Sequence, residues 1–147
     1  MPNLPTQHST PNTFSYLCTK YAFMTKDLEI DSKQLVDAIV SSMEDKKGLE
    51  IAYIDFSNVP NTIARYFVIC HGTSNTQVAT LADGVIDGVR ETLGSKPWNK
   101  EGYENAEWIL LDYADVVVHI FQENSRDFYN LEDLWADIEI TQIESKQ

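Results

Sequence analysis

The sequence predicts a single α/β domain in which one mixed β-sheet is flanked by helices. Three observations support this: 147 residues suit one domain plus tails, helical and strand patterns follow the order αββαββα, and no repeat or long linker divides the chain. Short loops between strands favour antiparallel pairs, and a strand–helix–strand crossover can add a parallel pair. We expect the domain at 27–137, between an N-terminal tail (1–26) and a C-terminal tail (138–147).

The first predicted elements are a helix and two strands. Asp31 and Gln34 have the spacing of a capping box, and apolar residues then recur at helical intervals until Gly48, which can end the helix. Residues 48–56 alternate in hydrophobicity and residues 66–70 form a short apolar run, so both predict strands. The alternation in the first strand places two pairs of side chains on opposite sides: Ile51 with Tyr53, and Ile54 with Phe56.

The second half of the chain repeats this order. Ser74 has capping-box spacing to a Gln, and an apolar stripe predicts a helix from there to Gly94. Residues 108–111 and 116–121 predict two strands joined by a tight turn. A last helix is expected after an N-cap at Ser125, with its apolar stripe formed by Phe128, Leu131, Leu134 and Trp135.

The charge of the chain is strongly acidic and unevenly distributed. The formal net charge is −12, and residues 101–147 hold 12 acidic residues against Arg126 and Lys146, a net of −10. Affinity for nucleic acid comes mainly from Lys and Arg that neutralise phosphates, so this surface predicts little direct nucleic-acid contact. A basic protein would instead be attracted. The alternative is that the acidity only keeps the protein soluble.

Location is predicted from what the sequence lacks. It has no run of 18 apolar residues, and its first residues have neither the basic nor the apolar region of a secretory signal. Two cysteines, Cys18 and Cys70, are too few for a disulfide framework, which predicts a reducing cytoplasm. Residues 1–26 are rich in Pro, Asn, Ser and Thr and are expected to be disordered. Because Met24 begins a stretch typical of a protein start, we expect the segment before it to be an extended start or a dispensable tail.

Two histidines could carry chemistry. His119 lies near Asp112 and Asp115, as an acid–base pair would, but no Ser, Cys or Lys is tied to it by spacing, so a structural or interface histidine is favoured. Cys70 and His71 adjoin, but a zinc site needs three or four ligands, and a thiol that ends an apolar strand is ordinarily buried. The sequence therefore predicts no catalytic residue, metal or cofactor.

Two glycine-containing segments are weaker candidates. Gly72, Thr73 and Ser74 lie between a strand and a helix, where backbone amides can hold a phosphate, but the P-loop pattern and basic neighbours are missing. Helix capping alone explains the Thr and Ser. Gly84 and Gly88 lie four apart on the predicted helix, where they either allow close backbone approach or merely cost helix stability, ~1 kcal/mol each relative to Ala.

The strongest candidate is a partner-binding face around Trp108. On a strand, Trp108, Leu110 and Asp112 share one side. Tyr113 and the carboxylates of Asp112 and Asp115 occupy the adjoining turn, where we expect exposed side chains. Aromatic residues rimmed by charge are typical interface anchors, although core burial is the default for an isolated Trp.

Two long segments carry a family resemblance. DFSNVPNTIARYFVICHGTSNTQVATLAD and EWILLDYADVVVHIFQENSRDFYNLEDLW closely resemble the ribosomal silencing factor family, also called Iojap-related proteins. The most specific pieces are YFVIC-x-GTS, W-I-L-L-D-Y, D-V-V-V-H and F-Y-x-L-E-x-L-W. The likeness runs from about residue 32 to 135, most of the predicted domain.

The resemblance implies a function without catalysis. Such proteins bind protein number fourteen of the large ribosomal subunit on the intersubunit face, block joining of the small subunit and lower translation when nutrients are scarce. The implied fold is similar to that of nucleotidyltransferases, without demonstrated transfer activity, and members can form homodimers. Family contacts with the ribosomal partner imply roles for Trp108 and, at the neighbouring turn, Tyr113.

The chain departs from the family pattern at several points, including Arg65 where an acidic residue is common, and one alternative function is open. The family turn usually reads D-Y-G-D, whereas Ala114 replaces the Gly here, so Ala is strained if the position needs a positive φ. The alternative function is a nucleotidyltransferase-like enzyme that uses the GTS turn with Asp112 and Asp115. That chemistry usually needs clustered carboxylates on a metal opposite the turn, and the spacing of these two acids across a turn disfavours it.

Overall fold

The computed structural model describes residues 30–62 and 64–144, which form one α/β unit. The predicted N-terminal tail, with Cys18 and Met24, lies outside the described residues. In chain order the elements are α2 (Ser32–Asp45), β1 (Leu49–Asp55), β2 (Tyr66–Gly72), α3 (Asn75–Leu93), β3 (Asn99–Glu101), β4 (Trp108–Asp112), β5 (Val116–Gln122), α4 (Glu123–Tyr129), α5 (Leu131–Leu134) and β6 (Ile140–Gln142). No helix in this described part is long and apolar enough to cross a membrane.

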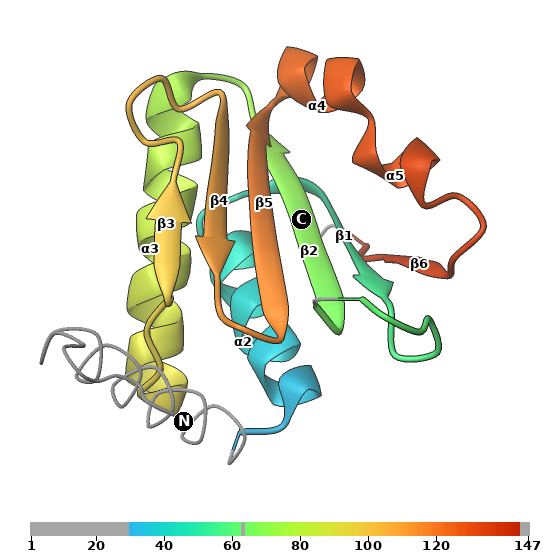
Figure 1. Cartoon of the computed structure of the whole chain (residues 1–147). Coiled ribbons are helices and arrows are strands. Elements are labelled where there is room, and N and C mark those ends of the chain that lie inside the picture. The colour runs from blue at the N-terminus through green and yellow to red at the C-terminus, as the bar shows by residue number, and fades with distance from the viewer. Residues whose placement is uncertain (1–29, 63, 145–147) are drawn as a thin grey trace, which may run out of the picture.

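The sheet is mixed, as the sequence predicts. Its six strands have the order β3-β4-β5-β2-β1-β6 (Figure 1). β2 and β5 pair in parallel at the centre, because the crossover between them runs through α3, and every other pair of neighbours is antiparallel. The antiparallel β4–β5 pair places Trp108 opposite Phe121 and Leu110 opposite His119.

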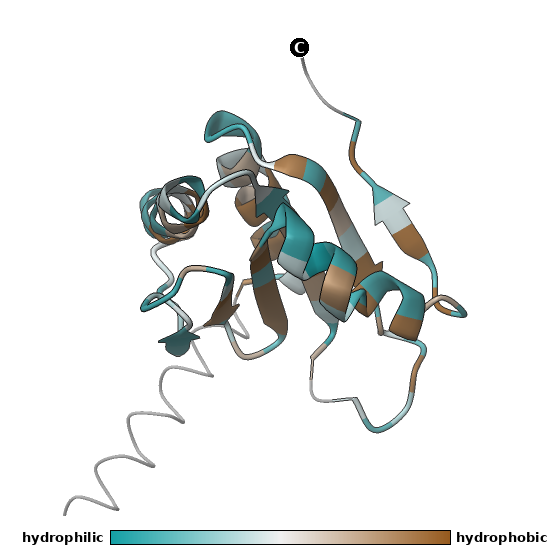
Figure 2. Ribbon diagram, turned by 90° about the horizontal axis from the view of Figure 1, so that it is seen from above, coloured by the Kyte–Doolittle hydropathy of each residue, from teal (hydrophilic) through white to brown (hydrophobic). Residues whose placement is uncertain are grey.

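Two helices cover one face of the sheet. α2 and α3 lie side by side behind the strands in Figure 1, and their buried stripes form the main core, α2 against β1, β2 and β5 and α3 against β2, β4 and β5. The strands at the centre are predominantly hydrophobic (Figure 2). Gly84 and Gly88 allow the close approach of the two helices, since a Cβ on Gly88 would lie 2.0 Å from Ser42 Oγ. Of the two roles considered for these glycines, the structure supports close approach.

The starts of α2 and α3 follow the predicted caps, with one difference. Asp31 and Gln34 form the full capping box. At α3, Ser74 Oγ accepts from the Gln77 amide at 3.1 Å, but the Gln77 side chain accepts from the Thr73 amide and not from that of Ser74. Gly94 ends α3 in the left-handed conformation, as expected. α2 ends earlier than Gly48, with Lys46 as its C-cap.

A smaller core lies on the opposite face. Ile54 and Phe56 meet Ile69 and Phe121 there, while Ile51 and Tyr53 join the main core. The predicted separation of the two sides of the first strand is therefore confirmed. The C-terminal helices pack beside this smaller core through Leu131 and Trp135.

The prediction of one last helix capped by Ser125 is wrong. Gln122 is the N-cap, and Asn130 adopts the left-handed conformation with φ 48°, which divides the segment into α4 and α5. The break splits the apolar stripe. Leu131 and Trp135 are half-buried, whereas Phe128 and Leu134 are 80% and 67% exposed.

The buried side chain of Arg126, paired with half-buried Glu132, connects these short helices to the sheet. Arg126, on α4, is buried and its Nη2 donates to Glu132 Oε2 at 2.6 Å, while its Nε donates to the other carboxylate oxygen at 3.1 Å. Its Nη1 donates to the Leu49 carbonyl and to His71 Nδ1. Arg126 therefore links α4, α5, β1 and β2.

Two short edge strands are absent from the predicted order. β3 pairs with β4, and β6 pairs with β1. The segment expected to be a C-terminal tail therefore contributes an edge strand to the sheet. Three-residue strands carry too little alternation to be recognised from sequence.

Candidate functional site

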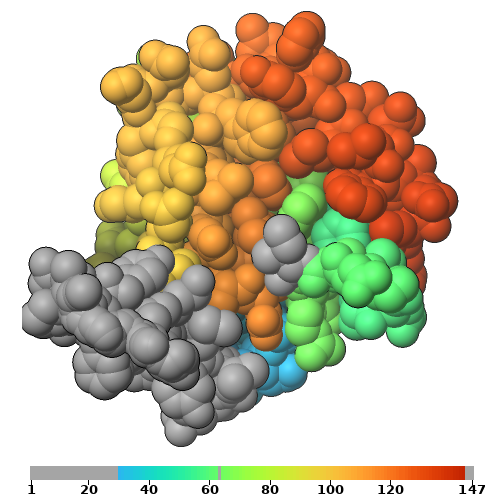
Figure 3. All heavy atoms as spheres, in the orientation of Figure 1, coloured from blue at the N-terminus to red at the C-terminus, as the bar shows by residue number. Residues whose placement is uncertain are grey.

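Trp108 lies on the face of the sheet opposite α2 and α3. Along β4 the buried residues alternate with half-buried ones, and Trp108, Leu110 and Asp112 are the half-buried set, as predicted. In Figure 3 residues of β4 and β5 are visible on this face between the segment before β4 and the C-terminal helices. The structure therefore brings three of the five predicted partner-binding residues together.

The indole is oriented by a hydrogen bond to the neighbouring strand. Trp108 Nε1–H donates to His119 Nδ1 at 3.1 Å. An indole nitrogen can only donate, so His119 Nδ1 must accept, and the ring is neutral with its proton on Nε2. Burial lowers the pKa of His119 to about 4, which keeps it neutral near pH 7.

Aromatic rings continue from Trp108 onto α4. Trp108 stacks on Phe121 with ring centroids 5.0 Å apart and contacts Tyr129 at 4.8 Å, and Tyr129 contacts Phe128 at 5.1 Å. Tyr129 is 51% exposed. Together Trp108, Phe121, Phe128 and Tyr129 form what we call the aromatic row.

The sequence did not predict Phe128 and Tyr129 as part of this face. It placed Phe128 in a continuous apolar stripe, so exposure was not expected. The residue that could have indicated the helix break is Asn130, because Asn tolerates the left-handed conformation and can end a helix. Once the helix breaks there, the two aromatic residues before the break are left beside Trp108.

The β4–β5 turn places Ala114 in a backbone conformation with positive φ, the case in which the sequence predicts strain. Its φ is 73°, a left-handed conformation that favours glycine. The turn is held from within, since the Ala114 amide donates to Asp112 Oδ1 at 2.9 Å and the Tyr113 amide donates to the Val116 carbonyl at 2.8 Å. One Asp112 oxygen thus stabilises the turn.

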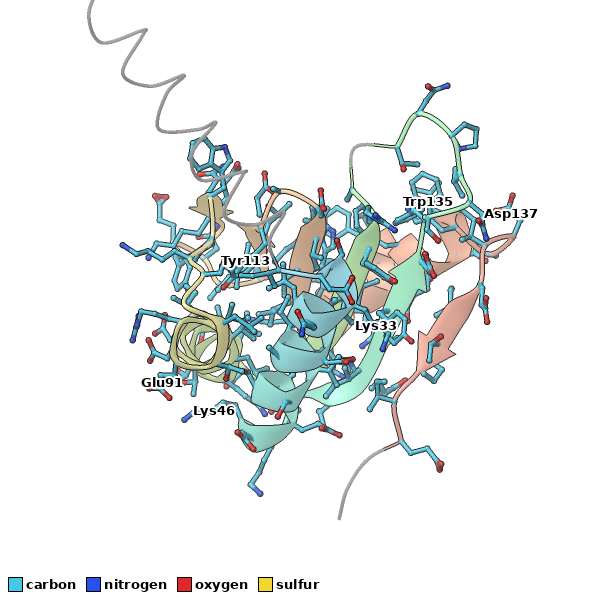
Figure 4. The ribbon with its side chains drawn as sticks, turned by 90° about the horizontal axis from the view of Figure 1, so that it is seen from below. Lys33, Lys46, Glu91, Tyr113, Trp135 and Asp137 are labelled. Carbon is cyan, nitrogen blue, oxygen red and sulfur yellow. The ribbon has the colours of Figure 1, made fainter. Side chains whose placement is uncertain are left out.

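The expectation that Tyr113 is exposed is wrong. Its side chain is 0% exposed and belongs to the main core, on the side of the sheet that faces α2 and α3. Figure 4 shows Tyr113 on the helix side of the sheet and Trp135 on the other side. Tyr113 follows Asp112, and strand alternation turns successive side chains to opposite faces.

Asp115 also differs from its prediction. It lies in the turn before β5, as expected, but its predicted exposure is wrong, because the residue is half-buried. The Asp115 carboxylate accepts from Ser32 Oγ at 3.1 Å, and its carbonyl accepts from the amides of Arg65 and Tyr66. Asp115 thus joins the first turn of α2 to the start of β2, where a carboxylate also complements the positive helix N-terminus.

Cys70 and His71, considered above as candidates for a metal site, have environments typical of structural residues. Cys70 is fully buried, and burial raises its pKa to about 12, so its thiol is protonated at neutral pH. His71 is held by Arg126, and burial together with the Arg126 charge lowers its pKa. Among residues 30–62 and 64–144, no three His, Cys, Asp or Glu side chains are grouped as metal ligands.

The GTS turn and the carboxylates lie far apart. In the parallel β2–β5 pair, Tyr66 is opposite Val116 and Gly72 is opposite Gln122. Asp115 therefore adjoins the first residue of β2 while the GTS turn follows its last. Six residue steps at ~3.3 Å each separate the two ends by roughly 20 Å. This geometry argues against a joint nucleotidyltransferase site.

Sequence comparisons identify relatives over most of the chain. A family model described as "Ribosomal silencing factor during starvation" matches residues 29–147. A ribosomal silencing factor RsfS of Halalkalibacterium halodurans is 36% identical over 115 residues, covering 78% of this chain and 97% of the relative. The Bacillus subtilis protein of the same name is 34% identical over 115 residues, covering 78% and 96%. The chloroplastic protein Iojap of Zea mays is 36% identical over 76 residues, covering 50% of this chain and 31% of the relative.

Solved structures agree with the sequence matches. A crystal structure of a Chromobacterium violaceum protein superposes with a TM-score of 0.68 at 33% identity and covers 73% of this chain and 88% of its own. One from Bacillus halodurans gives 0.63 at 34% identity, covering 76% and 98%. The fold and the sequence motifs therefore lead to one conclusion: this chain belongs to the ribosomal silencing factor family.

Proposed function

We propose that this protein represses translation by occupying the large ribosomal subunit. It binds ribosomal protein number fourteen on the intersubunit face and sterically blocks the small subunit, lowering translation under nutrient limitation. It acts in the cytoplasm and without catalysis. The names of its relatives support a ribosomal silencing role, and the resemblance to their family supplies the partner.

The observation that carries this proposal is the aromatic row beside half-buried Asp112. Exposed Phe128 and Tyr129 continue from the oriented indole of Trp108, which gives a continuous apolar surface. Aromatic anchors of this kind dominate protein–protein binding energies.

Charge selects the class of partner. The chain has a net charge of −12, so RNA phosphates are repelled, whereas a basic ribosomal protein is attracted. A blocker needs only to occupy the joining face with adequate affinity, and a micromolar Kd corresponds to about −8 kcal/mol. No reaction is required for this function.

Sedimentation with purified subunits tests the proposal. The protein should migrate with large subunits, and its addition should reduce the formation of joined ribosomes when small subunits are supplied. Migration at the top of the gradient with unchanged subunit joining would refute the proposal. Light scattering of the same preparation tests whether the free protein is a homodimer, as the family resemblance allows.

Trp108→Ala should weaken binding to large subunits while the protein stays folded. Truncating an anchoring aromatic typically costs at least about 2 kcal/mol, or about 30-fold in Kd. Tyr103→Ala is a matched control, because Tyr103 is also half-buried but packs against the main core. Circular dichroism of both variants checks folding. If Trp108→Ala unfolds the chain, Trp108 is a core residue and its assignment to the interface fails.

A further inference from the structure

A cavity of about 470 Å³ opens on the face that carries Trp108. This volume is within the usual range of ligand-binding pockets. The apolar side chains among the described residues that line it are Phe56, Ala64, Phe67, Leu110, Val117 and Trp135. Exposed Asn61 and Thr62 lie on its rim, and two groups able to form strong polar contacts, Asp112 and His119, also line it.

His119, which lines the cavity, has a hydrogen-bond donor without an acceptor in the described part of the chain. Nδ1 accepts from Trp108, so Nε2 carries the proton. Nε2 is buried and has no hydrogen-bond partner in the described part of the chain. A buried donor without an acceptor is costly, and an acceptor supplied by a ligand would recover that free energy. Because Nε2 is covered, the acceptor reaches it only when a neighbouring side chain moves, and the Phe67 ring, whose centroid is 4.6 Å from the imidazole centroid, is the nearest aromatic one.

The cavity and the indole belong to one surface. His119 lines the cavity and also holds the Trp108 ring, and Leu110 and Asp112 follow Trp108 along the same side of β4. A polypeptide seated on Trp108 would therefore cover the mouth of the cavity. Asp112 gives this mouth a negative group, which favours a positively charged segment over an anionic one.

From these contacts we infer that the cavity receives an apolar side chain from a basic segment of the ribosomal partner, and that a carbonyl oxygen of this segment accepts from His119 Nε2–H. The inference rests on the proposed function, because it assigns a binding role to a further part of the same face. It adds His119, Val117 and Phe67 to the residues that decide affinity.

Two substitutions of His119 distinguish the role of its donor, Nε2–H, from that of its acceptor, Nδ1. In His119→Asn the amide oxygen can replace Nδ1 as the acceptor for Trp108, but the Nε2 donor is lost. In His119→Gln the longer side chain can return an N–H to the position of Nε2. We expect the Asn variant to bind purified large subunits about five- to tenfold more weakly, and the Gln variant to lose less.

Filling the cavity provides a second variant. Val117→Phe adds a ring to the cavity wall and should reduce affinity about tenfold without lowering the thermal unfolding midpoint. Leu93→Phe is the control, since Leu93 is partly buried at the end of α3 and packs against the main core. Its affinity should match that of the unmodified protein.

The outcomes distinguish this inference from the function on which it rests. If the unmodified protein binds, Trp108→Ala weakens binding, and both His119→Asn and Val117→Phe bind normally, the cavity inference is overturned and the proposed function stands. If the unmodified protein does not bind large subunits, the proposed function fails, and the cavity inference fails with it. Native mass spectrometry that finds a small molecule on the free protein, absent from Val117→Phe, would also overturn the inference, because the cavity would then hold a free ligand.

Discussion

His119 connects the stability of the fold to its candidate binding face. Its ring is buried between Trp108, which donates to it, and Phe67, with which it forms an edge-to-face contact. Charging the imidazole would break the Trp108 contact, because a protonated Nδ1 cannot accept. The residue that orients the indole is therefore also a source of acid sensitivity.

His119 should make the protein less stable as the pH falls from about 6.5 to about 4. Its pKa is about 4 in the folded state against 6.5 normally, so between these values the unfolded chain binds a proton that the folded chain does not. The loss in unfolding free energy should reach about 3 kcal/mol at the acid end of this pH range. Above about pH 6.5 His119 should cause no such loss. Urea titrations across this range, compared with His119→Asn, measure the effect. An unchanged pH slope in the variant would contradict it.

Ala114 lowers stability through its backbone conformation. A non-glycine residue in the left-handed region costs ~1 kcal/mol or more, and glycine loses part of that gain through its freedom in the unfolded state. Ala114→Gly should therefore raise the free energy of unfolding by about 0.5 kcal/mol, as measured by chemical denaturation. Ala79→Gly, inside α3, is the control and should lower it by ~1 kcal/mol. A loss of stability in both variants would show that the turn is not strained.

At the scale of elements, α4 and α5 depend on polar contacts more than on apolar burial. Phe128 and Leu134 are exposed. The apolar contacts of these two helices with the smaller core come from half-buried Leu131 and Trp135. The buried Arg126 supplies the remaining connections to Glu132, His71 and Leu49. Because Tyr129 on α4 contacts Trp108, the position of α4 also shapes the aromatic row.

Glu132→Gln should loosen these helices. It leaves the buried guanidinium without its charged partner, so the unfolding free energy should fall by about 1–3 kcal/mol. Glu123→Gln, an exposed change at the start of α4, should have little effect. Hydrogen exchange should show faster amide exchange in α4 and α5 of Glu132→Gln than in α3. Uniform acceleration over the whole chain would instead indicate that the ion pair stabilises the entire fold.

At the scale of the whole molecule, the two faces of the sheet have different roles. α2 and α3 bury one face in the main core, while the other face combines a small core, the aromatic row and a cavity. The acidic C-terminal third of the chain, residues 101–147, includes β4, β5, α4 and α5, which contribute to that second face.

Position, and not total charge alone, should decide how charge affects binding. Asp112→Asn and Glu91→Gln each remove one negative charge, but Asp112 lines the cavity and Glu91 lies on α3 (Figure 4). Asn keeps an oxygen for the Ala114 amide, so the turn should survive. We expect Asp112→Asn to slow association with large subunits severalfold at low salt and Glu91→Gln to change it little. Association rates at two salt concentrations measure this, and equal effects would contradict a local role.

Local sequence patterns determined much of this protein by themselves. Caps at Asp31 and Ser74 and a glycine at Gly94 give helix limits, because they depend on neighbouring backbone groups. Two-residue alternation places Trp108, Leu110 and Asp112 on one face, because it follows from strand geometry. The motifs that carry the family resemblance are also local, and the family matches confirmed it.

Only the tertiary structure decided which of these residues face the solvent. Tyr113 is buried because α2 and α3 cover its side of the turn, and Asp115 meets Ser32 across 83 positions of sequence. β6 exists because the edge of β1 is available to it. These outcomes depend on contacts between distant segments, and local patterns contain no information about which surfaces such contacts will cover.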